Sequence, residues 1–161
     1  MEVILVVKGV VFDINSSSPM LLLKISNEER YLPIWIGLFE AQAIVSKLDN
    51  IPTPRPMTHD LLNNLIKGVG LTIEKIVISD LIENTYYAEI HLTKDNQKFV
   101  IDSRPSDAIA LALRYECNIF AGENLMKKAK FIDISSPPDE KELLRRWLDE
   151  LDVEILGKYE M

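Results

Sequence analysis

The stretch from Ile101 to Arg114 carries the residues best suited to chemistry. Asp102, Arg104 and Asp107 lie there within a few positions of one another. Carboxylates are preferred ligands of Mg²⁺ and Mn²⁺, and an arginine can hold a phosphate through a forked contact. We therefore predict a site for an anionic substrate at this stretch, with Asp102 and Asp107 as metal ligands.

Residues of the same kinds occur earlier in the chain. A histidine can act as a general base, and acids that hold metal ions can activate a water molecule and stabilise a leaving oxygen. His59-Asp60 supplies the first kind and Glu40 a further acid. The predicted catalytic residues are Glu40, His59, Asp60, Asp102 and Asp107, and the predicted substrate-binding residues are Arg55 and Arg104.

Each of these residues also has a purely structural interpretation. Acids such as Glu40 and Asp107 are favoured in the first turn of a helix by the helix dipole. His59 follows Thr58, an expected helix cap, and Arg104 suits a local ion pair with either neighbouring aspartate. The sequence leaves both interpretations open.

The common catalytic signatures are absent. The sequence has no Walker A loop, no G-x-G-x-x-G, no H-E-x-x-H, no G-x-S-x-G and no Cys/His zinc spacing. It contains two histidines, His59 and His91, and one cysteine, Cys117, so it forms no internal disulfide. Known nucleotide-loop, zinc and serine-hydrolase classes are thereby disfavoured.

Composition indicates a globular protein of one domain with an appendage. The 161 residues are 47% hydrophobic and 27% charged. The net charge of −7 argues against a broad basic surface for nucleic acid. No apolar run reaches the roughly 18 residues of a membrane span, and no signal-peptide pattern begins the chain. We expect a cytoplasmic protein without membrane contact.

Hydrophobic periodicity predicts the elements that position these residues. Pro105 suits the first position of a helix, and the alanines after it favour a buried helix. The other expected elements are strands at 2–12, 20–25, 30–34, 71–80, 86–93, 97–101 and 118–121, and helices at 37–48, 59–69 and 123–130.

The order of elements repeats along the chain. Val10 and Val77, Ile34 and Ile101, and many other similar pairs share one offset of 67 residues without a gap. Repeats set the architecture. We predict an α+β fold in which a three-strand, two-helix unit is duplicated (1–68 and 70–137) to form one strongly twisted, barrel-like sheet covered by helices.

The last part of the chain differs in character. Ser135–Pro138 reads as a boundary, and 138–161 as a C-terminal helical appendage. Leu143, Leu144, Trp147 and Leu148 form an apolar stripe there. We expect this stripe to be buried, either against its own domain or against a partner.

Four separated motifs resemble the bifunctional nuclease domain family, from about Met1 to Phe131. They are Val7–Asp13, Leu32–Gly37 with Glu40–Ala41, Arg55–Leu62 and Ile101–Ala112. Ser103 stands where the family usually has alanine. The resemblance implies a duplicated α+β fold, nuclease activity on DNA and RNA, and a homodimer.

Two functions of different classes therefore compete. The motif resemblance favours a nuclease that hydrolyses phosphodiester bonds of DNA and RNA with the help of Mg²⁺ or Mn²⁺. The acidic charge and the missing signatures favour a non-enzymatic binding or regulatory module for an anionic ligand or a partner protein. The discriminating question is whether the motif residues converge in space.

Overall fold

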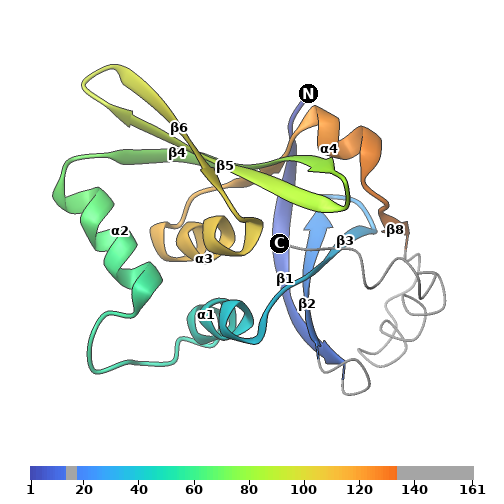
Figure 1. Ribbon diagram of the computed structural model, residues 1–161, viewed down its shortest axis with the longest axis horizontal. Helices are drawn as coiled ribbons and strands as arrows, with labels where there is room; N and C mark the ends of the chain where they lie inside the picture. The colour runs from blue at the N-terminus through green and yellow to red at the C-terminus, as the bar shows by residue number, and fades with distance from the viewer. Residues whose placement is uncertain (14–17, 134–161) are drawn as a thin grey trace.

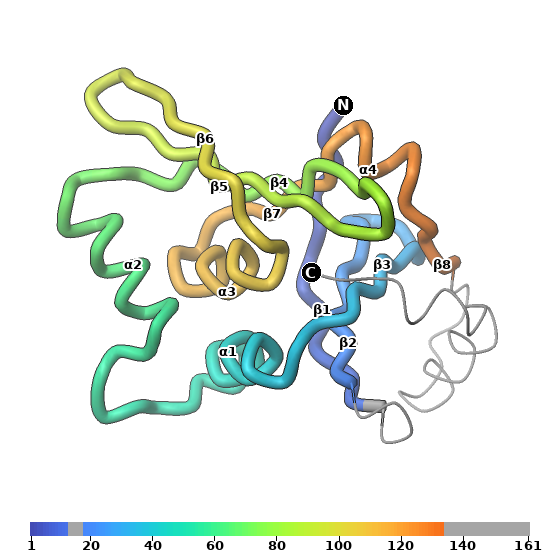
Figure 2. Tube along the Cα trace, viewed as in Figure 1, coloured from blue at the N-terminus to red at the C-terminus, as the bar shows by residue number. Residues whose placement is uncertain are grey.

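A computed structural model describes residues 1–13 and 18–133 (Figures 1 and 2). The predicted appendage at 138–161, with its apolar stripe, lies outside the described residues. The described elements are β1 (Val3–Asp13), β2 (Ser18–Ile25), β3 (Arg30–Trp35), α1 (Leu38–Leu48), α2 (Thr58–Gly68), β4 (Thr72–Ile82), β5 (Thr85–Lys94), β6 (Gln97–Ser103), α3 (Pro105–Tyr115), β7 (Ile119–Ala121), α4 (Glu123–Lys128) and β8 (Ile132–Asp133).

The strands form one twisted sheet in the order β6-β5-β4-β7-β1-β2-β3-β8. Two antiparallel meanders, β1-β2-β3 and β4-β5-β6, are joined through β7, which runs parallel to β4 and antiparallel to β1. The predicted α+β class is confirmed. The sheet keeps two edges, at β6 and β8, and does not close into a barrel.

The main core lies between the sheet and helices α1 and α3 (Figure 1). Helix α1 packs against β1 and β2, and α3 packs against β4 and β5. Ala108, Ala110 and Ala112 of α3 are fully buried, as expected for a central helix. Small side chains let neighbouring helices approach closely, and α3 indeed contacts both α1 and α2. No helix among the described residues is long and apolar enough to cross a bilayer.

The element bounds follow the predicted repeat. Helices α1 and α3 begin and end 67 residues apart, and so do the first residues of β2 and β5 and of β3 and β6. The later parts differ, because the second unit places β7 between its two helices. Superposition of the halves 1–68 and 70–137 stays a prediction.

Two local expectations were wrong. Thr58 is the first residue of α2 rather than its cap, because Met57 holds the N-cap position and donates its backbone N–H to the Asp60 carboxylate at 2.9 Å. Strand β6 continues to Ser103 instead of ending at Ile101, so Asp102 is part of a strand. Asp102 pairs with Glu89, which alternates with the buried residues Ala88 and Ile90.

Candidate active site

The N-termini of α1 and α3 meet beside a cavity of about 480 Å³. The chain that leads into α2 also contributes residues to its lining. The lining residues come from these three helices and their approaches: Phe39, Glu40, Gln42, Ala43, Val45, Ser46, Ile51, Thr53, Met57, Thr58, His59, Arg104, Asp107 and Arg114. Motifs from distant parts of the sequence therefore share one cavity.

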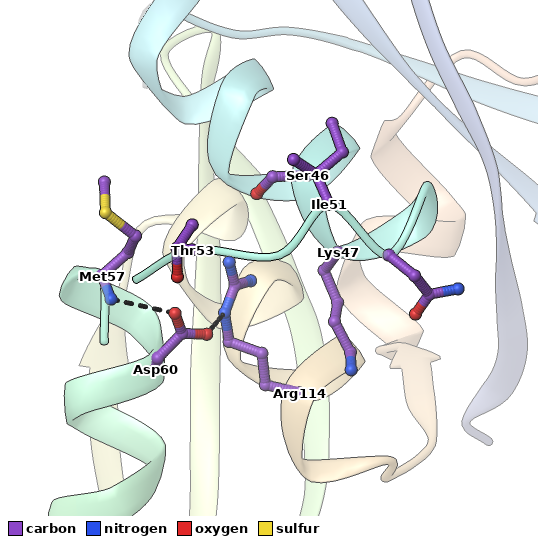
Figure 3. A pocket seen from close by; sticks show the side chains of 8 residues that line it. Ser46, Lys47, Ile51, Thr53, Met57, Asp60 and Arg114 are labelled. Carbon is purple, nitrogen blue, oxygen red and sulfur yellow. Dashed lines mark hydrogen bonds and ion pairs between the residues drawn. The ribbon is translucent and has the colours of Figure 1, made fainter. Parts of the chain in front are cut away.

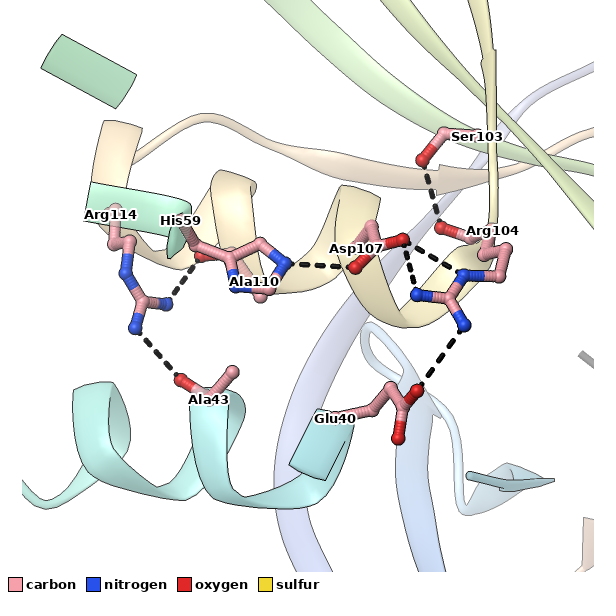
Figure 4. A network of polar contacts seen from close by, with 8 residues as sticks. All are labelled: Glu40, Ala43, His59, Ser103, Arg104, Asp107, Ala110 and Arg114. Carbon is pink, nitrogen blue, oxygen red and sulfur yellow. Dashed lines mark hydrogen bonds and ion pairs between the residues drawn. The ribbon is translucent and has the colours of Figure 1, made fainter. Parts of the chain in front are cut away.

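Asp107 is the centre of the polar network in this cavity (Figure 4). Its Oδ1 lies 2.9 Å from His59 Nε2, and its Oδ2 accepts from Arg104 Nε at 2.9 Å. Arg104 Nη2 also lies 2.9 Å from Oδ2. Both carboxylate oxygens are thus engaged, one by a histidine of α2 and one by the arginine that precedes α3.

Glu40 completes the network from α1. Arg104 Nη1 donates to Glu40 Oε1 at 3.2 Å, so one guanidinium joins the first turns of two helices (Figure 4). The hydrogen bond to Asp107, and to a smaller degree the charge of Glu40, raises the pKa of Arg104. Gly37 gives the Glu40 carboxylate its place, because a Cβ there would collide with it. The network leaves the Arg104 side chain 49% exposed, so it can also reach a ligand.

His59 is held in one orientation by Asp107. A carboxylate only accepts hydrogen bonds, so His59 donates its Nε2–H and keeps Nδ1 as the nitrogen that can take a proton. The His59 side chain is 13% exposed and lines the cavity. A fixed tautomer next to a cavity is what a general base requires.

Arg114 and Asp60 form a second, more buried group (Figure 3). Arg114 Nε donates to Asp60 Oδ1 at 2.7 Å, and its other nitrogens donate to the carbonyls of Ala110 and Ala43 at 2.9 and 3.0 Å. The Met57 N–H and, to a smaller degree, Arg114 lower the pKa of Asp60. Arg114 thereby ties α1, α2 and α3 together, and it lines both the main cavity and a neighbouring one of about 270 Å³.

The structure brings together four of the predicted site residues: Glu40, His59, Arg104 and Asp107. Asp60 lines the neighbouring cavity and not the main one. Asp102 and Arg55 line neither, since Asp102 faces the side of the sheet turned away from α3 and Arg55 lies exposed in the loop before α2.

The predicted metal ligands Asp102 and Asp107 do not form a cluster with other side chains of the described residues that could bind a metal ion. Among residues 1–13 and 18–133, no group of three or more His, Cys, Asp or Glu side chains is placed to hold a metal ion. Asp107 has both oxygens engaged, whereas Glu40 has one oxygen paired with Arg104. The donors fit a cation that is held by one carboxylate and by substrate phosphate, which is a common arrangement for Mg²⁺.

Sequence reasoning missed two residues of this site. Arg114 reads as a basic residue in the last turn of a helix, where the dipole alone explains it. Its side chain is nevertheless only 6% exposed and bonds to residues of α1, α2 and α3. Phe39 reads as part of the apolar side of α1 but is 82% exposed at the cavity. A helical-wheel comparison with the buried residues Ala41 and Ile44 could have separated Phe39 from the core.

The sequence of this chain is similar to those of several known proteins. Two uncharacterised proteins from strains of Mycobacterium tuberculosis are each 38% identical over 123 residues, which is 76% of this chain and 73% of theirs. A protein of rice named bifunctional nuclease 2 is 28% identical over 62% of this chain and 32% of its own length. A protein of the same name from Arabidopsis thaliana is 26% identical over 52% of this chain and 26% of its own length.

The family model of the bifunctional nuclease domain matches residues 21–133. The matched region holds every side chain of the Asp107 network and all elements from β3 to β8, whereas β1 and the first residues of β2 precede it. With four of its motif residues gathered at one cavity, the chain belongs to the bifunctional nuclease domain family.

Proposed function

We propose that this protein hydrolyses phosphodiester bonds of DNA and RNA at the cavity between α1 and α3. The observation that carries the proposal is the His59–Asp107–Arg104 network, in which a fixed histidine and a solvent-accessible guanidinium share one carboxylate. Family membership and the names of the plant relatives support the same reaction class.

Each residue of the network has a distinct task. DNA lacks the 2′-hydroxyl that could act as an internal nucleophile, so one mechanism for both nucleic acids needs water. His59 Nδ1 takes a proton from that water molecule. The oxygen of the water then attacks phosphorus, and the P–O bond to the leaving oxygen breaks. Arg104 holds the phosphate oxygens. Asp107 is a positioning residue for both His59 and Arg104. The leaving oxygen takes a proton from solvent.

Glu40 is the residue that would hold Mg²⁺ or Mn²⁺ together with substrate phosphate. Such a cation supplies charge stabilisation for the leaving oxygen when it is bound. Glu40 also keeps Arg104 in place through the contact at 3.2 Å. Removal of divalent cations with EDTA therefore tests the part of the proposal that concerns metal.

The test is cleavage of end-labelled single- and double-stranded DNA and RNA by purified protein, with Mg²⁺, with Mn²⁺ and with EDTA. Arg104→Ala should lower the rate about 10²–10³-fold, as loss of one donor to a developing oxyanion does. Cleavage that is unchanged in both Arg104→Ala and Asp107→Asn points to a contaminating nuclease. No cleavage by folded wild type favours the binding module for an anionic ligand or partner.

A homodimer is part of the proposal, and β6 is the surface that suits it. This strand is an edge of the sheet and exposes Phe99, Val100 and Ile101 at 40%, 56% and 47%. An apolar edge strand is a ready template for pairing with a second copy. Wild type should have the mass of a dimer in light scattering, and Val100→Lys that of a monomer. A monomeric wild type contradicts this assignment.

A further inference from the structure

Phe39 is a large apolar side chain that the fold does not use. It lies in the first turn of α1, where the buried residues are Ala41 and Ile44, and it is 82% exposed. A phenylalanine can bury about 150–250 Å², so its position in solvent forgoes that gain. Its exposure is therefore more informative than the burial of the residues beside it.

The exposed ring lies at the charged network. Phe39 precedes Glu40 and lines the same cavity as His59, Arg104 and Asp107. Ile51 and Met57, which are 54% and 55% exposed, add apolar surface to this cavity. The cavity thus has a charged part that suits a phosphate and an apolar part that suits the flat face of a base.

The negative charge of the protein limits how strongly the phosphate backbone of a nucleic acid could bind at this cavity. Of the two arginines that line the cavity, Arg114 is 6% exposed and engaged with three acceptors, so only Arg104 is free to meet solvent, at 49% exposure. Binding of a duplex depends on many phosphate contacts, and the net charge of −7 opposes them. Affinity must then come from contacts to bases.

We propose that Phe39 is a stacking platform for an unpaired nucleobase next to the phosphate held by Arg104, so that single-stranded DNA and RNA are the preferred ligands. In a duplex the base faces are covered by their neighbours, whereas an unpaired base can stack on an exposed ring. This inference rests on the proposed function, because it names the substrate class of the same cavity.

The test is equilibrium binding, measured by fluorescence anisotropy in EDTA with labelled phosphorothioate oligonucleotides that resist cleavage. Three ligands of equal length are compared: a single strand, its matched duplex, and a single strand whose bases are replaced by abasic sites. Wild type should bind the normal single strand most tightly. Phe39→Ala should weaken that binding about 5- to 150-fold and leave binding of the abasic strand unchanged.

Two variants serve as controls. Phe39→Trp should keep the preference for bases, since a larger aromatic ring can still stack. Tyr87→Ala removes an exposed aromatic ring from β5, 39% exposed and on the face of the sheet turned away from the core, and should bind as wild type does.

Three results would overturn the stacking platform. The first is equal binding of normal and abasic strands by wild type. The second is unchanged binding of the normal strand by folded Phe39→Ala. The third is a different oligomeric state of Phe39→Ala in light scattering, which would make the ring a subunit contact. Cleavage that persists alongside any of these would leave the nuclease proposal standing. Absence of cleavage by wild type would contradict the nuclease proposal instead. Failure of the stacking proposal and failure of the nuclease proposal can therefore be told apart.

Discussion

Replacing His59 by alanine should lower kcat/KM for phosphodiester cleavage about 10²–10⁴-fold, the range that a positioned general base contributes. This corresponds to roughly 3–5.5 kcal/mol of barrier. The reason is geometric: His59 is the histidine that lines the cavity, and Asp107 holds it at 2.9 Å in the tautomer that leaves Nδ1 able to take a proton. Initial rates with a labelled oligonucleotide measure the effect.

The chain offers a matched control for this substitution. His91 also lies 2.9 Å from a carboxylate, that of Glu89, but on the face of β5 turned away from the core. His91→Ala should therefore keep wild-type rates. Added imidazole should restore part of the activity of His59→Ala, because the cavity can admit it. Equal rates for His59→Ala and wild type would remove the histidine from the mechanism.

Replacing Arg114 by methionine should lower the free energy of unfolding by about 2–4 kcal/mol. Methionine keeps much of the aliphatic stem, so the loss reports the guanidinium. Without it the carbonyls of Ala43 and Ala110 lose a charged donor, and Asp60 loses its ion pair. Urea unfolding followed by circular dichroism measures the change.

The control for this prediction is Arg30→Met. Arg30 is paired with Glu28 but is 41% exposed, so its loss should cost under about 1 kcal/mol. An equal cost for both variants would show that Arg114 ties no helices together.

The pH dependence separates the ion pair of Arg114 from its bonds to carbonyls. The folded state lowers the pKa of Asp60 below its ordinary value of 3.8. The stabilisation from its carboxylate is therefore present above that value and is lost as pH falls through the lowered one. The Met57 N–H, which is the larger cause of the lowered pKa, remains in Arg114→Met, so only the share that Arg114 contributes differs between the two proteins. The stability difference between wild type and Arg114→Met should therefore narrow as pH falls below 3.8.

Local signals carried much of the fold. Pro105 at the first position of α3, with Asp107 in its first turn, was predictable because helix starts depend on neighbouring residues. Glu40 and Asp107 also lie at the repeat offset of 67 residues and occupy equivalent places in α1 and α3. Both carboxylates indeed contact Arg104, which is the part of the site that the sequence brought within reach.

The features that could not be predicted depend on contacts between segments that are distant in the sequence. Arg114 bonds Ala43 and Asp60 across 71 and 54 residues, and no local pattern announces such contacts. Asp102 was misplaced because β6 extends further than expected. Since side chains alternate along a strand, its register opposite Glu89 turns Asp102 to the far face. The short strand β7, which joins the two meanders, likewise depends on its partners more than on its own three residues.

The position that precedes α1 is Gly37 and the one that precedes α3 is Arg104, at the same offset of 67 residues. A nucleic-acid strand has a direction, from its 5′ to its 3′ end. A cleft with identical halves would accept either direction equally. The guanidinium precedes α3, whereas Phe39 lies on α1. If Arg104 holds a phosphate and Phe39 the neighbouring base, as proposed, the two helix starts offer different partners to a bound strand. The strand would then enter with one polarity, and the cut would leave its phosphate on a defined end of the product.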